Sequence, residues 1–233
     1  MEQLKPLYKL RGLKRVYAKG DETIVAVNNV DLDIHPGKLV LVNGKSGSGK
    51  TTLLNLMGGL ENPTAGEIQF KGFNIAKFSQ HELTRWRREE IAFIFQGFAL
   101  LPGLTATENV DLPLRIAGVS PGVIADRVSR YLGLVGLTKR AEHRVFELSG
   151  GEQQRVAIAR ALVKQPAVIL ADEPTGELDR KTGIKVFALF KRLVKEEGIS
   201  FCLTSHDTNA GQFADEIHTI KDGEMVERKV HAR

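Results

Sequence analysis

The sequence predicts an α/β fold that combines a parallel core sheet, an antiparallel β region and an inserted helical region. In the last third of the chain, short apolar runs alternate with helical patterns, which is typical of a parallel sheet. Residues 7–34 instead contain strand-like segments separated by turns, which indicates an antiparallel sheet. Residues 97–165 are mostly helical in pattern and interrupt the core.

The composition is that of a folded globular protein. The chain has 233 residues, of which 42% are hydrophobic and 26% charged, and this excludes the disordered class. The net charge is +5, but the basic residues are interspersed with acidic ones, which indicates a solvated surface and no nucleic-acid partner. The single cysteine, Cys202, stands in an apolar run, so we expect a buried thiol and a reducing, cytosolic location.

No segment has the length and hydrophobicity expected of a membrane span. Residues 1–6 lack the apolar core of a signal peptide. No window approaches the roughly 18–20 apolar residues that a membrane helix requires. We therefore expect that the chain does not cross a membrane by itself.

The first hundred residues are expected to supply strands on both sides of one phosphate-binding element. Apolar alternation predicts strands at 7–16, 24–27 and 30–34, with an acidic turn at Asp21 and Glu22. Ser79 and Glu82 have the spacing of a capping box and predict a helix start. The further expected elements are strands at 38–42, 67–70 and 91–95, and a helix over 52–57.

The helical insertion and the last third follow from caps, breakers and apolar runs. Pro113 should kink or break a helix over 105–117. Ser120 and Pro121 predict the start of a helix that runs to Tyr131. The other expected elements are a turn at 148–151, helices at 152–164, 182–197 and near 209–214, strands at 168–171 and 199–204, and a hairpin of 216–220 with 224–227.

The stretch Gly44-Lys45-Ser46-Gly47-Ser48-Gly49-Lys50-Thr51 fits the phosphate-binding motif GxxxxGK(S/T). It follows a buried strand and opens a helix, which is the context that the motif requires. Its glycines let backbone N–H groups approach a phosphate, and the helix N-terminus adds positive charge. Lys50 should reach the outer phosphates, and the Thr51 hydroxyl should ligate Mg²⁺. We expect nucleoside triphosphate binding by residues 44–51 and the following Thr52.

Two acids follow the apolar strand at 168–171. In open α/β sheets, ligands bind at the carboxyl ends of the strands. Asp172 is therefore the expected Mg²⁺ partner of Thr51, and Glu173 is a candidate general base for the attacking water.

Residues 148–155, Leu-Ser-Gly-Gly-Glu-Gln-Gln-Arg, form a second candidate anion cradle before a helix. This octet resembles the signature motif of the ATP-binding-cassette (ABC) ATPases. The resemblance covers nearly the whole chain and implies one nucleotide-binding domain over residues 1–233 with a RecA-like P-loop NTPase core. It places the core and β subdomain at about 1–96 and 166–233, and a helical subdomain at about 97–165.

The resemblance also assigns roles to single residues. It implies that Tyr17 stacks on adenine, that Gln96 touches Mg²⁺ and water, and that the loop 176–179 crosses a dimer interface. Glu177 departs from the asparagine common in that loop. The catalytic set that we expect is Glu173, His206 and Lys50, the Mg²⁺ set is Thr51, Gln96 and Asp172, and the second cradle is Ser149, Gly150, Gly151 and Glu152.

Further stretches resemble the lipoprotein-releasing and macrolide-export branch of the family. They are 95–98, 100–102, 104–110, 112–114 and 171–176. This resemblance implies an ATPase subunit that binds ATP and Mg²⁺, pairs head to tail with a second copy, and drives an integral-membrane permease from the cytoplasmic face. Residues 100–114 are either part of the permease-docking surface or the core of the insertion.

Two other functions are compatible with the motifs. The same ATPase could drive a membrane partner that transmits force and moves no substrate. A soluble relative could act on nucleic acid or ribosomes, but the gap between the two cradles has no heptad pattern, and only one set of motifs is present.

Overall fold

The computed structural model describes residues 5–20 and 22–231, and within them it contains two sheets. The core sheet has six strands in the order β10-β9-β3-β8-β7-β6. Neighbouring strands are parallel except for β10, which forms an antiparallel hairpin with β9. The bounds are β3 Leu39–Asn43, β6 Ile91–Ile94, β7 Val168–Asp172, β8 Ser200–Ser205, β9 Glu216–Lys221 and β10 Glu224–Val230.

The second sheet is antiparallel and has the strand order β2-β1-β4-β5 within the described residues. Its strands are β1 Tyr8–Lys19, β2 Glu22–Ile34, β4 Ala65–Phe70 and β5 Phe73–Asn74. The helices are α1 Lys50–Met57, α2 Gln80–Glu89, α3 Ala106–Ile116, α4 Pro121–Leu134, α5 Gly150–Leu162 and α6 Arg180–Glu197. Short 3₁₀ turns cover Ile75–Lys77, Thr138–Arg140, Val145–Glu147 and Thr208–Gln212.

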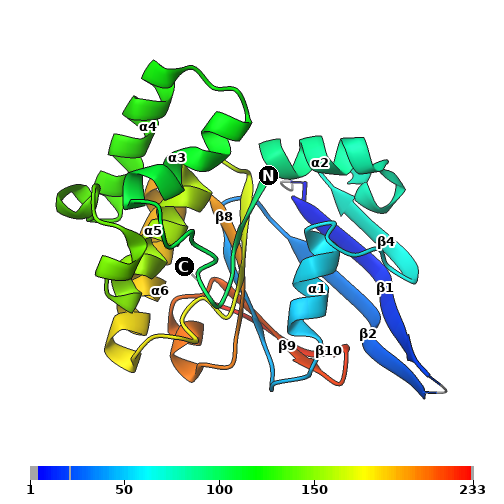
Figure 1. Cartoon of the computed structure of the whole chain (residues 1–233). Coiled ribbons are helices and arrows are strands. Elements are labelled where there is room, and N and C mark those ends of the chain that lie inside the picture. The colour runs from blue at the N-terminus through cyan, green and yellow to red at the C-terminus, as the bar shows by residue number, and fades with distance from the viewer. Residues whose placement is uncertain (1–4, 21, 232–233) are drawn as a thin grey trace.

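Both faces of the core sheet are buried, which explains the continuous apolar runs of its strands. Along β3, Leu39 and Leu41 join the cluster beneath α3, α4, α5 and α6. Val40 and Val42 point to the other face and join the cluster formed with α1 and the antiparallel sheet. Figure 1 shows these two groups of elements on opposite sides of the core sheet. The predicted α/β fold class is confirmed.

Several sequence-based expectations need correction. Helix α3 is continuous through Pro113 and is not broken there. The proline removes one backbone hydrogen bond, but Val110 and Leu114 on either side of it are both buried in the core and hold the two turns together. Helix α5 begins at Gly150 and not at residue 152, and the expected helix near 209–214 is a 3₁₀ turn.

Other expectations are confirmed. Ser79 and Glu82 form the capping box of α2, and Cys202 is fully buried. The helix expected to end at residue 197 does so, with Gly198 after it in a left-handed conformation. Burial raises the pKa of the Cys202 thiol to about 12, so it stays protonated near neutral pH. The expected turn at Asp21, and residues 1–4 of the N-terminal segment, lie outside the described residues. No helix in the described part of the chain is long and apolar enough to span a membrane.

Candidate functional site

The phosphate-binding loop connects β3 to α1 and is shaped by its glycines. Gly47 and Gly49 have φ angles of 78° and 104°, which residues other than glycine rarely adopt. A Cβ atom on Gly49 would lie 2.2 Å from the carbonyl oxygen of Ala26 in β2. The loop therefore packs directly against the antiparallel sheet. The first amides of α1 have no acceptor within the helix, so they are available to an anion.

Lys50 is the first residue of α1, and its side chain is only 6% exposed. Its ammonium group donates hydrogen bonds to the carbonyl oxygens of Gly44 and Lys45, at 2.8 and 3.1 Å. It also lies 3.2 Å from Glu173 Oε1. The loop thus folds around this cation.

Asp172 ends β7 and connects the loop helix to the neighbouring strand. Its Oδ2 accepts a hydrogen bond from the Thr51 hydroxyl at 2.8 Å, and its Oδ1 accepts one from the Thr204 hydroxyl at 2.6 Å. Thr204 stands opposite Asp172 in the parallel register of β7 and β8. Asp172 and Thr51 therefore lie side by side, as the sequence predicts.

Glu173 has a φ angle of 43°, in the left-handed region that non-glycine residues rarely adopt. Its N–H donates to the Thr204 hydroxyl at 3.1 Å, and its carbonyl accepts from the Gly176 N–H at 2.9 Å. Its Oε2 lies 2.9 Å from Nδ1 of His206, which follows β8. Unusual backbone geometry of this kind concentrates at functional sites, and here it points the carboxylate between Lys50 and His206.

A cavity of about 570 Å³ opens over the loop. Ten of the predicted site residues line it, together with Ala26: Lys45, Ser46, Gly47, Gly49, Lys50, Thr51, Thr52, Gln96, Glu173 and His206. Gly44 and Ser48 lie on the side of the loop that faces β9 and β10, where they line a separate cavity. Residues far apart in the sequence thus converge on one cavity over the phosphate loop.

Gln96 follows β6 and lies at the edge of this cavity. Its Nε2 donates to Glu177 Oε1 at 3.3 Å. A carboxylate only accepts hydrogen bonds, so the amide nitrogen faces Glu177. Glu177, the residue that departs from the family pattern, thus contacts Gln96 within this chain.

The second cradle does not line the cavity over the phosphate loop. Ser149 is the N-cap of α5, and its hydroxyl accepts from the Glu152 N–H at 3.4 Å. Glu152 Oε2 accepts from the N–H and the hydroxyl of Ser149, at 2.9 and 2.8 Å. These hydrogen bonds, first the one from the backbone of Ser149, lower the pKa of Glu152. The amides of Gly150 and Gly151 form the open first turn of the helix.

Tyr17, predicted to contact the base, lies on β1 outside the cavity lining. It pairs with Ile24 of β2, the strand whose Ala26 borders the cavity. Its hydroxyl donates a hydrogen bond to Glu61.

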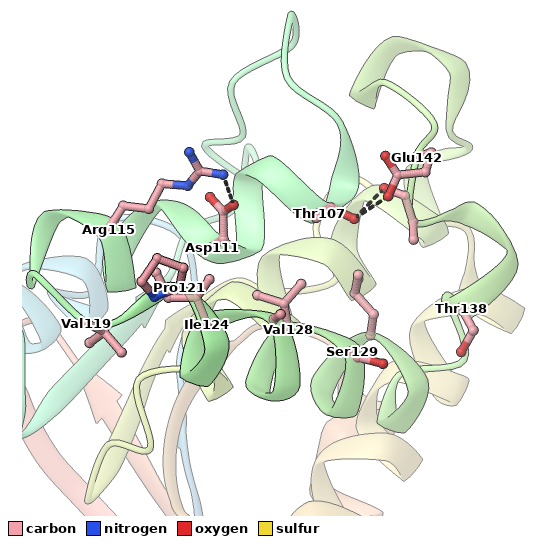
Figure 2. Close-up of a pocket in the computed structure, with 13 residues that line it drawn as sticks. Thr107, Asp111, Arg115, Val119, Pro121, Ile124, Val128, Ser129, Thr138 and Glu142 are labelled. Carbon is pink, nitrogen blue, oxygen red and sulfur yellow. Dashed lines mark hydrogen bonds and ion pairs between the residues drawn. The ribbon is translucent and has the colours of Figure 1, made fainter.

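A further groove of about 720 Å³ lies between α3 and α4 (Figure 2). Thr107, Asp111 and Arg115 line it from α3, at the i, i+4 spacing of one helix face. Ile124, Ala125 and Val128 of α4 contribute apolar surface. The adjacent face of α3, with Ala106, Val110 and Leu114, packs into the core, so this helix has both a core face and a groove face.

Comparison with known proteins shows the family to which the chain belongs. The model of the ABC transporter family matches residues 27–176, which contain the phosphate loop, Gln96, the second cradle and Glu173. The chain belongs to the ABC transporter family. It is an ATP-binding ATPase cassette of that family.

Two relatives and two solved structures resemble this ABC cassette along most of its length. The uncharacterized ABC transporter ATP-binding protein MJ0796 of Methanocaldococcus jannaschii is 45% identical over 231 residues, which is 97% of this chain and 98% of the relative. The macrolide export ATP-binding/permease protein MacB of Rhodopseudomonas palustris is 44% identical over 217 residues, which is 93% of this chain.

Among solved structures, a dimeric structure of the MJ0796 cassette matches with a TM-score of 0.88 at 43% identity, over 96% of this chain and 98% of that chain. A dimeric post-hydrolysis state of MJ0796 bound to ADP and Pi matches with a TM-score of 0.87 at 42% identity, over the same shares of the two chains. The cassette spans only 33% of the MacB relative, so it corresponds to the ATP-binding part of that longer protein.

Sequence reasoning missed two features of this ABC cassette. Thr204 holds both Asp172 and Glu173, but a threonine at a strand end carries no distinctive pattern. The second feature is the capping box that Ser149 and Glu152 form at the start of α5. These residues have the same three-residue spacing as Ser79 and Glu82, so this spacing was the signal for a helix that begins at Gly150.

Proposed function

We propose that Glu173 is the general base with which this ATPase cassette activates water for attack on ATP. The observation that carries the proposal is the position of its carboxylate, between Lys50 Nζ and His206 Nδ1 and beside the cavity over the phosphate loop. The side chain is 12% exposed, so it reaches the cavity while its two cationic or polar neighbours fix its orientation. A positioned carboxylate can then accept a proton from a water molecule.

The residues around the loop fit a Mg-nucleotide. Mg²⁺ in nucleotide sites is held by one or two carboxylates together with substrate phosphates and water, and not by a cage of protein ligands. Asp172 and Thr51 offer such a partial set, and Gln96 borders the same cavity. The described residues contain no group of three or more acidic, histidine or cysteine side chains that could hold a metal ion by itself. Bound ATP would supply the phosphoryl group that water attacks, and bound Mg²⁺ would neutralise charge on its oxygens.

The side chains and backbone amides around the cavity then have separate roles in hydrolysis. Lys50 and the amides of the loop bind phosphate oxygens and hold them in place. Glu173 accepts the proton of the attacking water at its carboxylate, and His206 orients that carboxylate through Nδ1. Thr204 keeps Asp172 and Glu173 in register through two hydrogen bonds.

Removal of the metal tests the Mg²⁺ assignment. We expect purified cassette to release phosphate from ATP with Mg²⁺ and to lose this activity when EDTA is in excess, with recovery on adding Mg²⁺ again. ATP binding, followed by calorimetry, should weaken in EDTA but not disappear, because Lys50 and the loop amides remain. Undiminished hydrolysis in EDTA would contradict the assignment.

We also propose that a second copy of the chain completes the site. The two anion cradles lie on different elements, and only one of them lines the cavity over the phosphate loop. The dimeric structures of MJ0796, which shares 43% identity with this chain, support this proposal. Ser149 and the amides of Gly150 and Gly151 would then close over the nucleotide of the partner.

We propose that ATP hydrolysis by this cassette drives a membrane permease. The direction of transport most consistent with the relatives is export. The MacB relatives are macrolide export ATP-binding/permease proteins that are about three times longer than the matched part. On this proposal the cassette lies on the cytoplasmic face of the membrane, with residues 1–96 and 166–233 as core and β subdomain and residues 97–165 as the helical subdomain.

The groove between α3 and α4 is the surface that we assign to the permease. It combines apolar walls with the carboxylates of Asp111 and Glu142, and Asp111 is 5% exposed with Arg115 as its ion-pair partner. Because Arg115 already neutralises Asp111, Glu142 is the carboxylate that remains for a partner. Charge complementarity therefore favours a cytoplasmic loop of the permease that carries apolar side chains and a basic one.

Filling the groove tests this assignment. Ala125 is exposed and lines the groove, so Ala125→Arg should fill the groove without disturbing the packing of the hydrophobic core. We expect co-purification with the permease to fall at least about tenfold, which corresponds to about 1.4 kcal/mol, while ATPase activity of the isolated cassette stays unchanged. Asp126→Arg, on an exposed neighbour outside the groove lining, is the matched control. Equal co-purification of the two variants would contradict the assignment.

A further inference from the structure

Tyr17 contacts the side chains of Glu61 and Arg15. The Tyr17 hydroxyl donates a hydrogen bond to Glu61 Oε2. The guanidinium carbon of Arg15 lies 4.6 Å from the centroid of its ring, and Arg15 Nε lies 3.2 Å from the same Glu61 oxygen. Asn55 Nδ2 donates to the other oxygen of Glu61 at 3.0 Å. One carboxylate thus connects the tyrosine, the arginine and the asparagine.

These residues come from β1 and from the helix that follows the phosphate loop, together with the segment after that helix. Arg15 and Tyr17 lie on β1, whereas Asn55 lies on α1, the helix that begins with Lys50. Glu61 follows α1, and its N–H donates to the Asn55 carbonyl at 3.4 Å. The cluster of Arg15, Tyr17, Asn55 and Glu61 therefore joins the tyrosine ring to the helix that holds the phosphates.

The charge of Glu61 is favoured where it lies. Burial raises the pKa of this carboxyl, but the hydrogen bonds from Tyr17 and Asn55 and the charge of Arg15 outweigh it, so the pKa lies below its ordinary value. Glu61 is thus an ionised, acceptor-only group near neutral pH, and each of its oxygens binds at least one donor. Hydrogen bonds to a charged group are stronger than neutral ones, which makes this an effective anchor.

The ring of Tyr17 has two faces, and Arg15 covers one of them. An aromatic side chain with both its hydroxyl and one face held has little rotational freedom to lose when a base stacks on the other face. A ligand binds more tightly when less conformational entropy is lost on binding, which is the general effect of preorganisation.

We propose that Glu61 and Arg15 are positioning residues for nucleotide binding: they hold the Tyr17 ring ready for a purine base before the nucleotide arrives. This inference rests on the proposed function, in which Tyr17 contacts the base. It adds that affinity for the base, and not for the triphosphate, depends on a carboxylate beyond the C-terminal end of α1. Asn55 completes the link between that carboxylate and the phosphate-binding helix.

The test compares two ligands that differ in the base. ATP carries base, ribose and phosphates, whereas inorganic tripolyphosphate carries phosphates only. Dissociation constants for both, measured by calorimetry with Mg²⁺, separate the base contact from the phosphate contact. We expect Glu61→Ala to weaken ATP about 5- to 10-fold, the effect of losing one good hydrogen bond, and to leave tripolyphosphate within about twofold. The KM for ATP should rise similarly while kcat stays unchanged.

Further variants separate the role of the Tyr17 hydroxyl from a general effect of lost charge. Tyr17→Phe keeps the ring and loses the hydroxyl, so it should weaken ATP like Glu61→Ala, and the double variant should add no further loss. Glu61→Gln keeps an acceptor for the tyrosine and should recover most of the affinity. Glu67→Ala removes an exposed carboxylate from β4, in the same sheet, and should change neither constant.

Each contrary result has a distinct meaning. Equal weakening of ATP and tripolyphosphate by Glu61→Ala would mean that Glu61 only supports the fold of the phosphate loop, and the proposal would fail. Unchanged ATP affinity in Glu61→Ala, with a clear loss in Tyr17→Ala, would also overturn it. Unchanged affinity in Tyr17→Ala would remove the base contact itself but would leave the assignment of Glu173 untouched, since that assignment concerns turnover.

Discussion

Glu173→Gln is expected to lower ATP turnover by about 10²- to 10⁴-fold, the range for loss of a positioned general base. The amide has the shape of the carboxylate and can still contact Lys50 and His206, but it cannot accept a proton from water. ATP binding should persist, because Lys50, the loop amides and Thr51 are unchanged. Phosphate release under saturating ATP and Mg²⁺ measures the first effect, and calorimetry measures the second.

Glu196→Gln is the control for this variant. Glu196 lies on α6, is half exposed and contacts only Arg192 among the described ion pairs, so its neutralisation should leave turnover unchanged. If Glu173→Gln turns over ATP as fast as this control, Glu173 is not the base, and a different group must take the proton.

Gly150→Glu is expected to reduce turnover roughly 100-fold or more while leaving the fold intact. Gly150 is the first residue of α5, and a Cβ atom there would be in ordinary contact with Leu178, at 3.5 Å. An acidic residue at a helix N-terminus stabilises the helix. The added carboxylate would face the phosphates of the partner's nucleotide, however, and juxtaposed like charges at an interface cost several kcal/mol. Turnover and thermal unfolding of the purified variant check the two halves of this expectation.

The matched control for this variant is Gly122→Glu. Gly122 occupies the second position of α4, and a Cβ atom there meets nothing within 4 Å. It therefore adds the same charge to another exposed helix start of the same subunit. If both variants keep full activity, the first turn of α5 does not approach a phosphate.

Much of this architecture could be predicted from the sequence because local patterns carry it. The motif over residues 44–51 contains its own glycines, cation and hydroxyl. In the structure Lys50 contacts the loop carbonyl of Gly44, and Thr51 contacts Asp172. The apolar run before Asp172 likewise places that acid at the end of a buried strand, beside Thr51.

Features that depend on contacts between distant segments could not be predicted. The anchor of Tyr17 joins residues that are 44 positions apart, and neither Glu61 nor Arg15 has a pattern that marks it. The left-handed backbone of Glu173 depends on Thr204, which is supplied by the neighbouring strand. Pro113 misled the prediction because burial on both sides of it keeps α3 continuous. In each case tertiary contacts, and not local preference, determine the geometry.

The central claim is that two chains share each nucleotide site. The mass of Glu173→Gln in solution, measured by sedimentation or light scattering with ATP and Mg²⁺, tests it most directly. We expect a particle of twice the 25.7 kDa chain with ATP, a single chain with ADP, and a single chain with ATP when Gly150→Glu is added. A Glu173→Gln protein that binds ATP and remains a single chain at every concentration tested would contradict the shared site.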